Sequence, residues 1–179
     1  MKSTTKQLLT VLHIVSWVFF VGLCIKTGAI LYSYFVSVVI NPEGAKNLHM
    51  GLDLSNLYAF DKGHYSTMVI FIIALSAFKA CIFYLLIKIF LKLNLVSPFS
   101  TEISAFITRI GFVALWIGVL TLFANGYCDW LSKKGVVFPT LQAYVGAGAE
   151  FLLMGGIIFI ISQIFKRGIE IQSENELTV

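Results

Sequence analysis

Long apolar runs alternate with shorter polar stretches along the whole chain. Four runs are long enough to cross a bilayer as α-helices, which takes about 20 apolar residues. They cover residues 8–40, 65–93, 104–131 and 140–165. This pattern predicts an all-α membrane protein with four transmembrane helices in an antiparallel bundle, forming a single domain over residues 1–179.

The polar stretches between these runs differ in length. The longest connection covers residues 41–64 and contains the turn sequences Asn-Pro-Glu-Gly and Asp-Lys-Gly. Leucines and aromatic residues recur in it, so we expect it to pack on the bundle or lie at the membrane interface. A polar tail at 166–179 follows the fourth run.

Composition supports the membrane assignment. The chain is 58% hydrophobic and only 12% charged, whereas soluble domains average about 25% charged residues. So few charges cannot cover a water-facing surface, so the lipid bilayer is the expected partner. The net charge of +4 comes from scattered basic residues that mostly flank the apolar runs, which does not indicate direct nucleic-acid binding.

Basic residues near the ends of the spans predict the orientation. Seven lie on the side that holds both termini, and four lie on the other side. The seven are Lys2, Lys6, Lys88, Lys92, Arg109, Lys166 and Arg167; the four are Lys46, Lys62, Lys133 and Lys134. The bias places both termini in the cytoplasm and the connection at 41–64 outside.

Three ionisable residues, Lys26, Lys79 and Glu150, fall inside the apolar runs. Such residues are costly in a membrane and frequently functional. Counted from the outer side, Lys79 lies roughly 21 Å deep and Glu150 roughly 15 Å deep. A pair between Glu150 and either lysine is therefore sterically reasonable. It can serve only to fix helix packing, or it can form part of a ligand site or ion path.

No sequence motif indicates catalysis or a cofactor. The histidines and carboxylates of the outer connection, His49, Asp53, Asp61 and His64, include ordinary metal ligands. Their spacing matches no metal motif, so we expect an ordinary polar loop. Patterns typical of hydrolases, metalloproteases and nucleotide-binding loops are absent from the sequence. We therefore expect no enzyme activity, no cofactor and no metal.

Small residues in the last two runs predict close helix packing. They occur as Ala114-x-x-x-Gly118 in the third run and Ala143-x-x-x-Ala147 in the fourth, which also contains Gly155 and Gly156. This distribution predicts that the fourth span is central in the bundle.

The connection between the second and third spans contains signals for a helix start. Pro98 ends the preceding helix at or before Ser97, and Ser100 is the expected N-cap of the next helix. Phe99 can pack back on that helix. Arg109 is expected to face the headgroups on the inner side.

Two stretches, one in this connection and one at the end of the chain, resemble the DUF2975 family of bacterial membrane proteins. The first reads PFSTEISAFITRIG, and the second is the tail IFKRGIEIQSENELTV. The matching residues are Pro98, Phe99, Arg109, Ile110, Gly111, Phe165, Arg167, Gly168, Glu170, Gln172, Glu174, Leu177 and Thr178. The four-span plan is also similar.

The resemblance implies a multi-pass protein of the bacterial cytoplasmic (inner) membrane with no established activity. Members of the family look like partners of small Xre-type helix-turn-helix regulators. The chain would then be a sensor or anchor that holds a cytoplasmic transcription regulator. The residues expected to dock it are Pro98, Phe99, Arg109, Arg167, Glu170, Gln172 and Glu174. The alternative is a small transporter or channel that uses Lys26, Lys79 and Glu150.

The tail is the strongest candidate for a docking surface. Phe165, Ile169 and Gln172 share one face if the helix passes through Gly168. We expect helix to about Ser173, lying along or just below the membrane.

Overall fold

The computed structural model describes residues 2–94, 99–137 and 142–177 of the chain, and it is helical throughout these ranges apart from short connections. Four long helices dominate it: α1 (Lys2–Phe35), α3 (Lys62–Lys92), α4 (Thr101–Lys133) and α6 (Gly148–Leu177). Each is long and apolar enough to cross a membrane. The predicted all-α fold with four transmembrane helices is confirmed.

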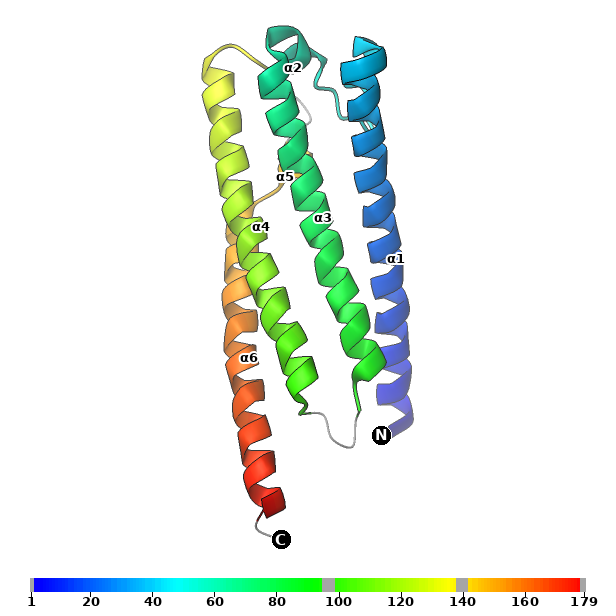
Figure 1. Ribbon diagram of the computed structural model, residues 1–179, viewed down its shortest axis with the longest axis vertical. Helices are drawn as coiled ribbons and strands as arrows, with labels where there is room; N and C mark the ends of the chain where they lie inside the picture. The colour runs from blue at the N-terminus through cyan, green and yellow to red at the C-terminus, as the bar shows by residue number, and fades with distance from the viewer. Residues whose placement is uncertain (1, 95–98, 138–141, 178–179) are drawn as a thin grey trace.

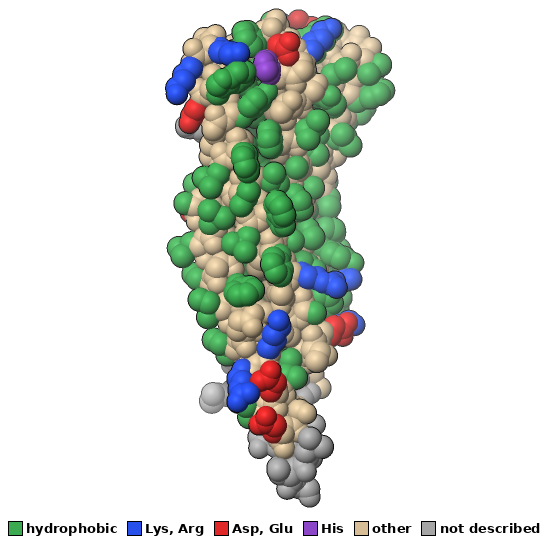
Figure 2. Space-filling view, turned by 60° about the vertical axis from the view of Figure 1, so that its left-hand side comes forward, with side chains coloured by type: hydrophobic (Ala, Val, Ile, Leu, Met, Phe, Trp, Pro, Cys, Tyr) green, Lys and Arg blue, Asp and Glu red, His purple; other side chains and the backbone are tan. Residues whose placement is uncertain are grey.

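Four short elements complete the described part of the chain. A π-helical segment (Val36–Ile40) extends α1, and a 3-10 helix (Pro42–Lys46) and α2 (Ser55–Phe60) lie in the outer connection. The fourth is α5 (Gln142–Val145), which precedes α6. Hydrophobic side chains cover the middle of the surface shown in Figure 2, whereas most charged side chains there lie toward the two ends. This distribution fits a protein that crosses a bilayer.

The long helices pack in chain order. α1 packs on α3, α3 packs on α4, and α4 packs on α6, with both termini at the same end of the molecule (Figure 1). Among the long helices of the described ranges, the α6 backbone lies close to that of α4 alone, and the Phe151 side chain of α6 reaches Lys79 of α3. The prediction that the fourth span is central is therefore wrong, because α3 occupies that place and α6 lies at one side.

Glycines allow α4 and α6 to approach closely. A Cβ atom built on Gly118 would lie 2.6 Å from the Leu152 side chain, and one on Gly155 would lie 2.8 Å from the Leu115 side chain. Gly118, from the predicted small-residue pair of the third span, is thus at the interface. Ala143 and Ala147 precede α6, so the fourth span uses its glycines for this purpose instead.

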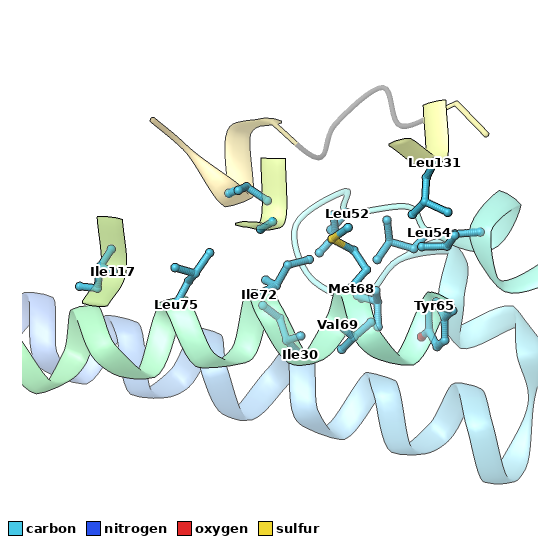
Figure 3. Close-up of a cluster of buried hydrophobic side chains, with 14 of the residues drawn as sticks. Ile30, Leu52, Leu54, Tyr65, Met68, Val69, Ile72, Leu75, Ile117 and Leu131 are labelled. Carbon is cyan, nitrogen blue, oxygen red and sulfur yellow. The ribbon is translucent and has the colours of Figure 1, made fainter. Parts of the chain in front are cut away.

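The outer connection packs on the bundle, one of the two positions expected for it. Four of its leucines, Leu48, Leu52, Leu54 and Leu57, are at most 1% exposed. Figure 3 shows Leu52 and Leu54 beside Met68 and Tyr65 of α3. The burial of these apolar side chains is what holds a nominally polar loop against the helices.

The fourth span begins later than the sequence predicts. The predicted start was Thr140, which lies outside the described residues, but the chain forms the short helix α5 and then a break before α6 starts at Gly148. Gly146 adopts a φ of +79°, a left-handed conformation that ends a helix. A Cβ on Gly148 would lie 2.9 Å from the Gly118 carbonyl oxygen, so α6 starts about halfway along α4.

Candidate functional site

Lys26 and Lys79 lie deep inside the two spans that carry them. Lys26 is about 21 Å from Ile40 along the helix axis, and Lys79 is about 20 Å from Lys92. Both side chains are half-buried. A four-methylene stem is too short to carry either ammonium group to the end of its helix. The two charges therefore stay within the membrane-spanning part of the molecule.

Aromatic rings from the segment around the α6 start face both lysines. The Lys26 Nζ lies 4.8 Å from the centre of the Tyr144 ring in α5, and the Lys79 Nζ lies 5.3 Å from the centre of the Phe151 ring in α6. The Tyr144 hydroxyl donates hydrogen bonds to the carbonyl oxygens of His49, at 2.6 Å, and Met50, at 3.1 Å. Tyr144 thereby connects the outer connection to the lysine site.

Glu150 is placed differently from the two lysines. It lies in the first turn of α6 with an exposed side chain. There its charge complements the positive end of the helix dipole. The ion pairs found among the described residues join other partners, so Glu150 is not paired with Lys26 or Lys79 within 4.0 Å. The break before Gly148 explains why Glu150 does not face the lysines. Because α6 starts at Gly148, Glu150 lies in the first turn of this helix and not in the middle of a longer span.

The lysine site has an excess of positive charge. Lys26 and Lys79 carry like charges and both contact the segment that holds Tyr144 and Phe151. A cation–π contact stabilises an ammonium group by about 0.5–2 kcal/mol. Removing an ion from water costs several kcal/mol. The two aromatic rings therefore offset only part of the cost of placing two charges here.

Asp53, Asp61 and His64 form hydrogen bonds that hold the outer connection and the start of α3. The Asp61 carboxylate accepts a hydrogen bond of 2.8 Å from the His64 backbone N–H and caps α3. The Asp53 carboxylate accepts from the Ser55 N–H and hydroxyl. The His64 ring forms a 2.6 Å hydrogen bond with the Tyr127 hydroxyl of α4. Within the described part of the chain, no three His, Cys, Asp or Glu residues are grouped as metal ligands.

At the end of the molecule that holds both termini (Figure 1), the connection between α3 and α4 packs on α6. The Ser100 hydroxyl caps α4 by accepting from the Ile103 N–H at 3.2 Å, as predicted. Phe99 packs on α6, with its ring centre 5.2 Å from that of Phe165, and a Cβ on Gly168 would lie 2.7 Å from the Phe99 ring. The expected packing of Phe99 on its own helix is thus replaced by packing on α6.

The other predicted docking residues spread over the same end. Arg109 is exposed on α4, and Lys92 forms an ion pair with Glu102 across the connection. Pro98 lies outside the described residues. These residues surround the end of the bundle from which α6 continues.

The tail is a continuation of α6. The helix passes through Gly168, as expected, and extends to Leu177, beyond the predicted end at Ser173. It continues along the α6 axis (Figure 1), and its expected position along or just below the membrane stays a prediction. The Arg167 guanidinium forms a 2.7 Å ion pair with Glu170. Glu170 and Glu174 are exposed, and Gln172 is half-buried.

Two residues of the lysine site were missing from the sequence prediction. Tyr144 and Phe151 flank the sequence Gly-Ala-Gly-Ala-Glu, and this run of small residues is the signal that could have located them. Glycine permits a break at membrane depth, and aromatic side chains beside such a break can turn toward neighbouring helices.

Comparison with known proteins identifies a family but no activity. The family model described as "Protein of unknown function (DUF2975)" matches residues 49–179. No curated protein and no solved structure matches the chain. The matched region contains Lys79, Glu150 and the whole tail, whereas Lys26 lies before it. Because the match spans more than half of the sequence, this four-span chain belongs to the DUF2975 family.

Proposed function

We propose that this protein is a non-catalytic sensor or anchor of the bacterial inner membrane, which binds a cytoplasmic regulator of the Xre helix-turn-helix type. The observation that carries the proposal is the helical extension of α6 beyond the start of α4. Phe99, two residues before α4, packs at the level of Gly168, so the residues after Gly168 project past the end of the bundle.

This projecting helix has the character of a binding surface. It presents the charged residues Arg167, Glu170 and Glu174 on a segment that continues a membrane span. An extension that served only to mark the end of the span would need basic residues alone. The family resemblance supplies the kind of partner, because members look like partners of small helix-turn-helix regulators.

The contact between Phe99 and α6 also supports this function. It couples the inner connection to the projecting helix, so a shift of α6 relative to α4 would move both parts of the surface. A sensor needs such a link between its membrane domain and its partner. Binding a ligand among the spans can then change how the regulator is held.

Co-purification of the full-length protein with the regulator tests the proposal. The variant to compare is a charge swap, Arg167→Glu with Glu170→Arg, which keeps an oppositely charged pair at the same spacing. We expect wild-type protein from its own cells to retain a helix-turn-helix protein, and the swapped variant to lose at least about tenfold of it, equivalent to about 1.4 kcal/mol.

A pair of basic residues far from the tail provides the control. Lys133 and Lys134 lie at the opposite end of the molecule, at the end of α4, so Lys133→Ala with Lys134→Ala should leave the retained amount unchanged. Failure to recover a helix-turn-helix protein, or equal recovery with the charge swap, would contradict the proposal.

A small transporter or channel is the second candidate function. It is favoured by the break between α5 and α6 at the depth of Lys26 and Lys79, since broken helices surround substrate sites in many transporters. Proteoliposomes offer a direct test, with release of trapped inorganic phosphate or chloride as the measurement. We expect Lys79→Met to reduce the flux at least about tenfold if this function is correct. Flux no greater than from protein-free liposomes would exclude these substrates.

A further inference from the structure

We infer that Lys26 and Lys79 together bind an anionic group, a carboxylate or a phosphate, within the membrane-spanning part of the protein. The inference concerns a ligand site inside the spans and does not depend on the docking of a regulator. It is carried by the convergence of two ammonium groups from different helices on a region where the described residues provide aromatic rings but no paired carboxylate.

Charge is the first argument for an anion. Both lysines are half-buried at mid-span, and their ammonium groups face rings that lie seven residues apart in the chain, Tyr144 and Phe151. Glu150 is exposed and forms no ion pair with either lysine. One bound anion between the two ammonium groups would balance this charge.

The second argument is the way the site is enclosed. Tyr144 lies over Lys26 and is hydrogen-bonded to the outer connection, whose leucines are fully packed. Phe151 covers Lys79 from the first turns of α6. The two rings therefore cover the lysines from the side of the outer connection and from α6.

The carboxylate or phosphate could belong to the headgroup of an acidic amphiphile or to a free anion in water. A thermal-stability experiment distinguishes these two sources. Purified full-length protein would be held in a neutral maltoside detergent, and its melting temperature measured by intrinsic fluorescence. The probes are sodium phosphate for a free anion, phosphatidylglycerol and oleate for an acidic amphiphile, and phosphatidylcholine as the lipid without net charge. A ligand that binds only the folded state raises the melting temperature in a saturable way.

We expect saturable stabilisation by sodium phosphate, or by phosphatidylglycerol or oleate, and none by phosphatidylcholine. Stabilisation by phosphate points to a water-soluble ligand, and stabilisation by the acidic amphiphiles alone points to a lipid-like one. The double variant Lys26→Met with Lys79→Met should lose the response. Lys62→Met is the matched control, because Lys62 also lies on α3 beside a tyrosine ring, 5.4 Å from the Tyr58 ring centre, but at the outer end. It should keep the response.

A charge-introducing variant tests the same inference by replacing one lysine of the site with a fixed anion. Lys26→Glu places a carboxylate opposite Lys79, so the protein supplies its own anion. We expect this variant to melt at a higher temperature than wild type in the absence of added anions, and to respond to none of them. The inference is overturned if no anion stabilises the wild type, if phosphatidylcholine does so equally, or if the double methionine variant responds as the wild type does.

Discussion

A Leu52→Ala variant is expected to release the outer connection from the bundle and to lower the free energy of unfolding by about 2–5 kcal/mol. Leu52 is fully buried and belongs to the cluster of apolar side chains formed with Leu54, Met68 and Tyr65 (Figure 3). Truncation removes apolar contacts and leaves a cavity that the packed helices can fill only partly. Thermal unfolding in detergent measures the change.

Met50 provides a control on the same connection. Its side chain is 85% exposed, two residues from Leu52. Met50→Ala should therefore change the melting temperature little. Limited proteolysis gives a second measurement, since the released connection of the Leu52 variant should be cut faster than that of wild type or of the Met50 variant. Equal melting temperatures for both variants would show that the connection does not stabilise the bundle.

A Gly155→Ala variant is expected to weaken the packing of α6 on α4. The added Cβ would meet the Leu115 side chain at 2.8 Å and the Leu115 backbone nitrogen at 3.0 Å. The side chain can turn away, but the backbone cannot move without separating the helices. Overpacking of this kind costs about 1–3 kcal/mol, which exceeds the gain of up to about 1 kcal/mol from replacing glycine by alanine in a helix.

The adjacent glycine makes the comparison direct. A Cβ on Gly156 would meet no atom within 4 Å. Gly156→Ala should therefore keep the stabilisation that alanine gives a helix, and melt at the same temperature as wild type or higher. The same contrast applies on α4, between Gly118→Ala, where the Cβ would lie 2.6 Å from Leu152, and Gly126→Ala, where space is open. If all four variants have the same melting temperature, the close approach of α4 and α6 is not required for stability.

The local signals of helix ends could be predicted from the sequence because they depend on neighbouring residues alone. Ser100 caps α4 through a bond to the backbone three residues on. The helix also passes through Gly168, as the apolar spacing of the tail indicates. In contrast, the partner of Phe99 depends on which helix lies beside it, and the structure places α6 there.

For the charged residues inside the spans, too, the sequence predicts their presence and the tertiary structure decides their partners. Their presence, and hence the existence of an unusual site, follows from Lys26, Lys79 and Glu150 in apolar surroundings. The predicted pairing assumed a continuous fourth helix from Thr140. The break at Gly146 places Glu150 in the first turn of α6, with an exposed side chain, and brings Tyr144 and Phe151 to the lysines instead.

The sequence by itself determined that this protein crosses a membrane with four helices, because the length and apolarity of a segment decide whether it can span a bilayer. Only the tertiary structure decided that α3 is central, that the outer connection is buried, and that two lysines face aromatic rings at mid-span. These features depend on contacts between residues far apart in the chain, such as Lys26 with Tyr144, and on the close approach that Gly118 and Gly155 permit between α4 and α6. A local pattern can mark the residues that take part, but it does not specify which distant residues they contact.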